Sequence, residues 1–318
     1  MAAAMGFARS SIGNWTMPHA LADQPECWPA LPLDSWNDTR ATLHMWTQMV
    51  GKVRLRLTPL VNHWWNVPLY VTARGLTTSR IPYEQKAFEL WFDFIGHRLV
   101  LETSDGIVKT IPLAPRSVAD FYREFMEMLR SAGITVKIWP MPVEIPDPIR
   151  FDQNRVHASY DPASAEKFWR ILLSAAAVFT QFRSEFIGKC SPVHFFWGSF
   201  DLAVSRFSGR RAPERPGADA VTREAYSHEL SSVGFWPGGG AVKDAAFYSY
   251  TSAEPPGFKE APVRPGAAYY ERQIGEFILM YENVRQAESP SAALLEFCKT
   301  TYEAGANLGN WDRKALER

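Results

Sequence analysis

The chain is poor in cysteine and has no long apolar run. Its 318 residues include three cysteines, Cys27, Cys190 and Cys298, which are widely spaced and form no CxxC pair. This spacing argues against a disulfide framework and a zinc-ribbon site, and it favours a reducing cytoplasm. No stretch approaches the roughly 20 apolar residues needed to span a bilayer, and the apolar start is too short for a signal peptide. We therefore expect a cytoplasmic protein with no membrane partner.

The chain also lacks an excess of charge of either sign. Lysine plus arginine and aspartate plus glutamate each number 34, so the formal net charge is zero. A balanced charge argues against a strong hold on nucleic acid, so we expect no nucleic-acid partner and predict a small-molecule ligand instead. A hydrophobic content of 46% with 21% charged residues is typical of a globular protein with one large domain or two ordinary ones.

Several strong catalytic and cofactor motifs are missing. HExxH, GxSxG and GxGxxG do not occur, and the glycine run 238–240 lacks the Lys-Ser/Thr that follows it in a phosphate loop. These absences disfavour a common metalloprotease or α/β-hydrolase, and they leave the cofactor unknown. A metal site with ligands distant in sequence stays open as an alternative, built from His157, His194, His228 and Asp201.

Aromatic side chains are abundant, at 14% of all residues with 12 tryptophans. They build a bulky core or line a pocket for a flat ligand. The stretch 190–211 mixes such rings with polar groups, among them His194, Asp201 and Arg206. Polar groups placed among aromatic strand residues are costly to bury without a partner. We therefore expect the ligand to be bound by this part of the chain.

The apolar spacing predicts an α+β fold. Residues spaced three and four apart predict helices at 35–57, 118–131, 163–187 and 290–304, and period-two stretches between them predict antiparallel strands. Residues 134–139 are predicted as a further short strand. The chain then divides into two similar halves, each an antiparallel sheet covered by long helices. The predicted boundaries are a leader at 1–33, a first half at 34–140, a linker or loop at 141–162 and a second half at 163–318.

The two halves share residues as well as element order. Thr47-Gln48 and Thr180-Gln181 lie at matching positions in the long helices, and His63 and His194 each precede a pair or trio of aromatic residues. This agreement predicts an internal duplication. The two sheets would then pack or join about a pseudo-twofold axis, with a ligand in the cleft between them. His63 and His194 would face each other across that cleft or mark the two sheet edges.

Candidate site residues follow from these patterns. His194 or His228 is the predicted general base, oriented by Asp201 or Glu229, because imidazole transfers protons near neutral pH. The predicted ligand-binding residues comprise guanidinium groups for an anion, rings for its apolar part and neighbouring polar groups: Arg206, Arg210, Trp197, Trp236, His63, Trp64, Tyr160 and His157.

The pattern favours an enzyme that acts on a small anionic, partly apolar or aromatic molecule by acid/base chemistry. A noncatalytic ligand-binding or scaffold protein is one alternative, and a metal-dependent enzyme with His, Asp and Glu ligands is another. The reaction class and the oligomeric state stay open.

Long stretches of the chain resemble a bacterial family of proteins of unknown function, DUF5996. The resemblance rests on LHMWTQMVGKVRL, NHWWNVPLYVTARGLTTSRIPY, FDQNRVHASYDP, IGKCSPVHFFWGSFDLAVSRFSGRR and TREAYSHELSSVGFWPGGG, and it spans about residue 28 to the end. It implies a bacterial, cytoplasmic protein of this length. It carries no activity, cofactor or catalytic residue to this sequence.

Overall fold

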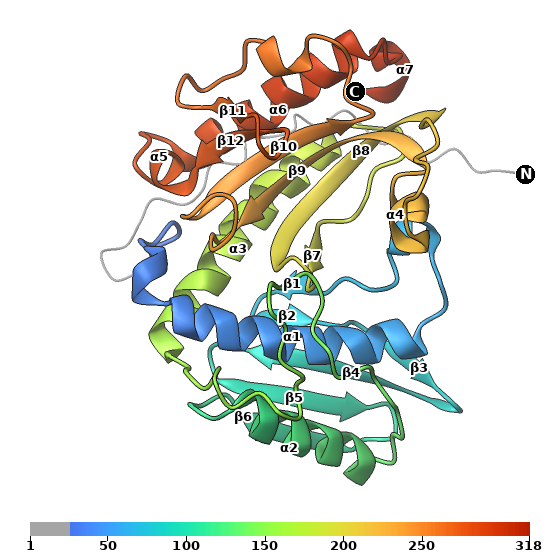
Figure 1. Cartoon of the computed structure of the whole chain (residues 1–318), viewed down its shortest axis with the longest axis vertical. Coiled ribbons are helices and arrows are strands. Elements are labelled where there is room, and N and C mark those ends of the chain that lie inside the picture. The colour runs from blue at the N-terminus through green and yellow to red at the C-terminus, as the bar shows by residue number, and fades with distance from the viewer. Residues whose placement is uncertain (1–25) are drawn as a thin grey trace, which may run out of the picture.

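Two antiparallel sheets and the helices that cover them make up the fold (Figure 1). A computed structural model describes residues 26–318, so most of the predicted leader 1–33 lies outside the described residues. Each sheet has six strands. This arrangement confirms the predicted α+β class.

The first sheet contains the strands of the first half in a meander. Its order is β1-β2-β4-β5-β6, and β3 pairs with β4. The strand bounds are β1 (Tyr70–Thr72), β2 (Gly75–Thr77), β3 (Ile81–Tyr83), β4 (Lys86–Asp93), β5 (Arg98–Thr103) and β6 (Val108–Pro112). Helix α1 (Asn37–Leu57) crosses in front of this sheet in Figure 1, and α2 (Val118–Ser131) packs beside it.

The second sheet has the order β11-β12-β10-β9-β8-β7. Its strands are β7 (His194–Phe196), β8 (Asp201–Arg211), β9 (His228–Trp236), β10 (Ala246–Ser252), β11 (Tyr269–Glu271) and β12 (Glu276–Met280). Helix α3 (Pro162–Ser184) runs behind this sheet in Figure 1, together with α6 (Pro290–Leu308). The short helices of this half are α4 (Ala220–Ala225), α5 (Tyr281–Arg285) and α7 (Arg313–Leu316).

Local signals explain where the long helices begin and end. The Ser117 side chain accepts a hydrogen bond from the backbone N–H of Asp120, and Gly133 follows α2 with φ 71°. The Asp161 side chain accepts from the backbone N–H of Ser164, and Pro162 occupies the first turn of α3. The predicted helices at 118–131 and 163–187 are thereby confirmed, the second ending a few residues earlier than expected.

The two sheets meet at their edges. Leu69, just before β1, and Phe195 in β7 exchange two backbone hydrogen bonds of 2.9 Å. One main hydrophobic core runs through both halves and includes Trp46, Phe92, Phe168 and Phe247. The order of helix, antiparallel strands and closing helix recurs in the two halves, and a common ancestral unit stays a prediction.

The predicted strand at 134–139 is wrong. No strand pairs with these residues, and the Tyr83 hydroxyl instead accepts a hydrogen bond from the backbone N–H of Thr135 at 2.9 Å. The chain stays irregular from there to α3 and packs against the first helix instead. The side-chain amide of Gln48 in α1 holds this segment by two hydrogen bonds to the backbone of Val143. It donates to the C=O at 2.8 Å and accepts from the N–H at 2.9 Å.

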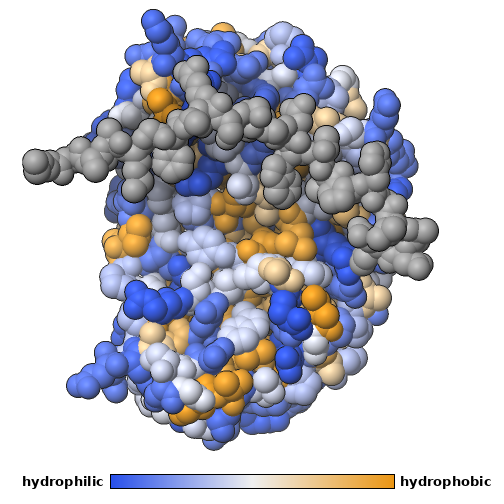
Figure 2. Space-filling model, turned by 180° about the vertical axis from the view of Figure 1, so that it is seen from behind, coloured by the Kyte–Doolittle hydropathy of each residue, from blue (hydrophilic) through white to orange (hydrophobic). Residues whose placement is uncertain are grey.

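The surface is mixed in character. None of the helices described here combines the length and the apolar composition needed to cross a bilayer. Seen from behind, apolar patches lie between polar side chains (Figure 2). The large apolar residues exposed within 26–318 come from separate segments and include Leu60, Trp139, Val156 and Ile187.

Gly75 is required where β2 begins beside β4. A Cβ atom there would lie 1.8 Å from the carbonyl oxygen of Phe92, a backbone atom that cannot move without breaking the sheet. We expect Gly75→Ala to lower the free energy of unfolding by about 3 kcal/mol, as measured by urea denaturation. Gly266→Ala is the matched control, because a Cβ there meets nothing within 4 Å. Equal stability of the two variants would contradict the tight strand approach.

Candidate functional site

The second sheet has two chemically different faces. The face toward α3 and α6 is mainly apolar and joins the main core through residues such as Leu202, Val204 and Phe235, with Arg206 and a few small hydroxyl residues among them. The alternate residues point to the other side, and we call that side the hydroxyl face. It comprises Asp201, Ala203, Ser205, Ser232, Gly234, Tyr248 and Tyr250. Figure 1 looks onto this face, which is turned away from α3.

Hydroxyl groups on this face bond one another across three strands. The Ser205 and Ser232 hydroxyl groups lie 3.0 Å apart, and those of Tyr226 and Tyr250 lie 3.1 Å apart. Asp201 accepts hydrogen bonds from Ser199 and from Tyr248. Burial raises the pKa of the Asp201 carboxyl group, against the lowering effect of these donors.

Gly234 makes room for this network. The Tyr248 ring crosses β9 at Gly234 to reach Asp201 on β8, and a Cβ at 234 would lie 2.3 Å from that ring. A small residue is therefore needed in the middle strand. The result is a polar face with buried small residues at its centre and partly buried tyrosine rings around them.

A strained turn covers one edge of the hydroxyl face. In the short 3-10 turn at Asn62–Trp64, His63 and Trp64 have φ values of 58° and 60°. This left-handed backbone conformation is rarely adopted by residues other than glycine. The end of α4 holds the turn in place. The backbone N–H of His63 donates to Glu224 Oε1 at 3.2 Å, and its Nδ1 lies 3.0 Å from the carbonyl oxygen of Ala225.

These contacts fix the protonation of His63. A carbonyl oxygen only accepts, so Nδ1 carries the proton that is donated to Ala225. Nε2 is then an acceptor, and the ammonium group of Lys189 donates to it at 2.6 Å. Burial lowers the pKa of His63, and the nearby Lys189 charge lowers it further. His63 is therefore a neutral imidazole that receives a hydrogen bond from a lysine.

Lys189 has aromatic neighbours and no acidic partner. Its Nζ lies 5.3 Å from the centre of the Trp65 ring and 4.9 Å from that of Phe207. Within residues 26–318, no carboxylate oxygen lies within 4 Å of this nitrogen. Burial lowers the pKa of Lys189, and only Glu224 acts in the opposite direction. The ammonium group thus keeps donors for a further acceptor.

His228 completes the cluster at the start of β9. The Ser227 hydroxyl donates to the carbonyl oxygen of Glu224 at 2.9 Å, so it accepts from His228 Nδ1 at 3.0 Å. That leaves His228 Nε2 with a lone pair. The rings of His63 and His228 are 5.6 Å apart in an edge-to-face arrangement. Burial lowers the pKa of His228, and the charges of Lys189 and Arg211 lower it further. We call Lys189, His63 and His228 the lysine–histidine cluster.

The structure brings His63 and His228 together and places His194 beside them. The Trp65 ring contacts one histidine from each half, with its centre 5.3 Å from that of His63 and 5.7 Å from that of His194. His194 is fully enclosed, and its Nε2 has no hydrogen-bond partner among the described residues. Burial lowers the pKa of His194 to about 3. It is therefore a buried neutral ring next to the cluster.

Other predicted site residues have protein partners elsewhere. Arg206 points to the helix face, where it lies over the Phe182 ring at 3.5 Å and the Tyr302 ring at 4.4 Å. Arg210 pairs with Glu229 at 2.7 Å and also bonds a carbonyl beyond α6. Neither guanidinium group reaches the lysine–histidine cluster, because alternation along β8 turns Arg206 away and the Glu229 carboxylate holds Arg210.

The three tryptophans predicted to contact the ligand lie in different parts of the structure. Trp197 is buried beside α1 and donates Nε1 to Val67 at 2.8 Å. Trp236 is half-buried on the hydroxyl face but packs against Gly240 at its far end. Trp64 lies in the strained turn, and its buried Nε1 has no partner among residues 26–318. Only the turn therefore places a predicted tryptophan next to the cluster.

Tyr160 and His157 stay in the irregular segment before α3. The Tyr160 ring stacks on Trp46, and its hydroxyl lies 3.0 Å from His97 Nδ1. His157 bonds the side chain of Asn154 through Nδ1. Both side chains contact neighbours within the first half and do not join the other predicted site residues.

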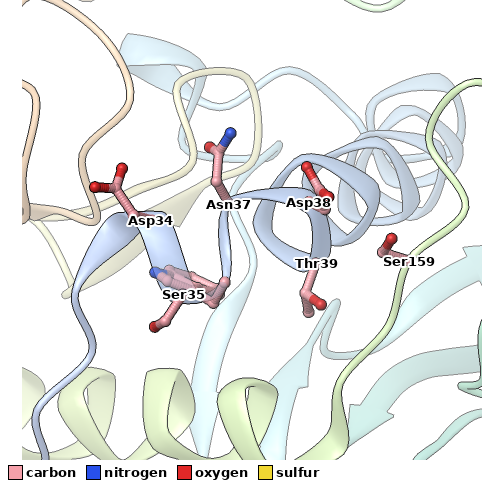
Figure 3. Close-up of a pocket in the computed structure, with 7 residues that line it drawn as sticks. Asp34, Ser35, Asn37, Asp38, Thr39 and Ser159 are labelled. Atoms are coloured by element: carbon pink, nitrogen blue, oxygen red, sulfur yellow. The ribbon is translucent and has the colours of Figure 1, made fainter.

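A hollow of about 390 Å³ lies at the start of α1 (Figure 3). Its polar lining includes Asp34, Asn37, Asp38 and Ser159, which Figure 3 shows around the first turn of the helix. No predicted site residue lines it. The described residues also hold no group of three or more His, Cys, Asp and Glu side chains able to bind a metal ion, so the structure does not assemble His157, His194, His228 and Asp201 into one site.

Comparison with known proteins gives one match. The model of a family described as "Family of unknown function (DUF5996)" matches residues 28–318. No curated protein and no solved structure matches the chain.

The buried His194 makes a prediction about acid stability. Its pKa is about 3 in the folded protein against an ordinary value of 6.5, so in this range the unfolded chain binds a proton that the folded protein does not. As the pH falls below 6.5, wild type should lose stability relative to His194→Gln by about 1.4 kcal/mol per pH unit. Urea denaturation of both proteins from pH 6.5 to 4.5 measures this. A stability difference independent of pH would contradict a neutral His194.

Proposed function

The chain belongs to the family of unknown function DUF5996, and from its site geometry we propose an enzyme that moves a proton on a small anionic, partly aromatic molecule bound at the lysine–histidine cluster. The observation that carries the proposal is the ammonium group of Lys189. It donates to a neutral imidazole at 2.6 Å, lies near two aromatic rings and has no carboxylate within 4 Å among the described residues.

Lys189 is the anion-binding group in this proposal. A lysine ammonium carries three donors, and His63 accepts one of them. The remaining donors suit a carboxylate or phosphate oxygen. Glu224 acts on the pKa of Lys189 from a distance, but no described carboxylate pairs directly with the ammonium group. His63 is a positioning residue, because its fixed Nδ1 proton turns Nε2 toward the lysine.

His228 is the proposed general base. Its Nδ1 is held by Ser227, which leaves a lone pair on Nε2, and the Lys189 charge is near enough to affect the ring. Burial and the neighbouring Lys189 and Arg211 charges keep the pKa of His228 low, so the ring is neutral at pH 7 and able to accept a proton. Trp65 and Phe207 offer ring faces to an apolar part of the ligand.

We further propose that the protein works in the bacterial cytoplasm. The proposal rests on three cysteines that form no disulfide in the described residues and on the resemblance to a bacterial family. The proposed reaction is proton transfer between the ligand and His228.

Binding tests the role of Lys189. We expect aromatic carboxylates or aryl phosphates, screened by thermal shift, to bind wild type and to bind Lys189→Met at least about tenfold more weakly, since a charge-assisted hydrogen bond is lost. Arg210→Met is the matched control, because Arg210 lies on β8 but pairs with Glu229. Equal binding by Lys189→Met and wild type would place the anion site elsewhere.

Turnover tests the role of His228. Mass spectrometry should show a bound metabolite consumed by wild type, while His228→Gln retains binding and loses about 10²-fold or more in rate, as expected for a missing general base. A ligand that wild type retains unchanged would favour the noncatalytic binding protein instead.

A further inference from the structure

Lys52 belongs to a row of three polar residues along one side of α1. His44, Gln48 and Lys52 follow each other at intervals of four residues, so they lie on one helix face. The first two have protein partners. His44 Nε2 donates to the carbonyl oxygen of Gly198 at 2.8 Å, and the Gln48 amide bonds the backbone of Val143 in both directions. The third is the exception.

The Lys52 side chain is largely buried, and its amine has no polar partner among the described residues. The residue is 5% exposed, and within residues 26–318 its Nζ makes no hydrogen bond and has no carboxylate within 4 Å. Its neighbours are two indole rings, with Nζ 5.1 Å from the centre of Trp139 and 5.8 Å from that of Trp197. Burial lowers the pKa of Lys52 to about 8. A desolvated lysine among rings is the usual setting of an amine nucleophile.

The two rings differ in how they are held. Trp197 donates Nε1 to the carbonyl oxygen of Val67 at 2.8 Å, and it packs so closely on Gly51 that a Cβ there would lie 2.3 Å from the ring. Trp139 is 63% exposed and lies on the irregular segment after α2. The amine therefore has a fixed inner wall and an outer ring that faces solvent.

We propose that Lys52 forms a reversible imine with a small aromatic aldehyde or ketone whose ring lies against Trp139. The neutral amine attacks the carbonyl carbon, a C–N bond forms, and the π electron pair of the C=O bond moves to oxygen. That oxygen takes up one proton while nitrogen releases one to water. The oxygen takes up a second proton, the nitrogen lone pair forms the C=N bond as the C–O bond breaks, and water leaves. The iminium nitrogen then releases its remaining proton to water, which gives the neutral imine. No oxidant or reductant takes part.

This site is independent of the lysine–histidine cluster. Lys189 is tied to an imidazole acceptor at 2.6 Å, which holds it as an ammonium donor. Lys52 has no such acceptor, and it lies on the first helix rather than at the edge of the second sheet. The two lysines therefore suit different chemistry, and either proposal can fail without the other.

Reductive trapping tests the proposal on the full-length protein. Benzaldehyde with sodium cyanoborohydride at pH 7.5 converts any imine into a stable benzylamine, which peptide mapping assigns to a residue. With a pKa of about 8, roughly one amine in four is neutral at this pH, so we expect Lys52 to be labelled about tenfold faster than an ordinary lysine. The internal reference is Lys137, which is exposed on the same segment as Trp139.

The aromatic preference is tested with propanal and with Trp139→Ala. Wild type should label Lys52 faster with benzaldehyde than with propanal, after correction by the two rates at Lys137, and the variant should lose this preference. Because Trp139 is exposed, the variant is expected to fold. Labelling of Lys52 no faster than Lys137, or an unchanged preference in Trp139→Ala, would overturn the proposal.

Discussion

The hydrogen bond from Lys189 to His63 joins two parts of the chain that are far apart in sequence. It links a residue just before β7 to the strained turn before β1, across 126 residues of sequence. The bond requires a neutral His63 whose Nδ1 proton is donated to Ala225, so it also requires α4 in place. Cation–π contacts with Trp65 and Phe207 contribute about 0.5–2 kcal/mol each. They do not replace a counterion, so the ammonium group keeps its capacity for an anion.

The unequal faces of the second sheet give this bond its surroundings. Long helices cover one face with apolar side chains, as in many antiparallel sheets. The other face carries hydroxyl groups and the buried carboxyl of Asp201, and it needs glycine at 234 so that Tyr248 can cross β9. Hydrogen bonds among these groups let the largely buried polar face form without a covering helix. The lysine–histidine cluster lies at the edge of this face, where the first half of the chain meets it.

Much of the fold is readable from the sequence because its signals are local. Ser117 and Asp161 cap the long helices, and alternating apolar residues mark β4 and β5. The strand predicted at 134–139 fails because pairing depends on a partner that the sequence does not name. Helix α4 has a local signal that pattern analysis passes over: the Asp219 side chain accepts from the backbone N–H groups of Val221 and Thr222.

The candidate site could be predicted only in part from the sequence. His63 and His228 are singled out by residue type and lie next to each other in the structure, but Lys189, Trp65 and Glu224 join them through tertiary contacts that no spacing reveals. Arg206 could have been placed from the sequence, because it shares the β8 face of the apolar Leu202 and Val204 and therefore points into the core.

The protonation of His63 tests the account most directly. Nitrogen-15 NMR of the two ring nitrogens at pH 7 distinguishes the neutral tautomers from each other and from the imidazolium ion. We predict a proton on Nδ1 and none bound covalently to Nε2, with an Nε2 shift that changes in Lys189→Met. An imidazolium ring, or a proton on Nε2 instead of Nδ1, would contradict the hydrogen bond on which the lysine–histidine cluster depends.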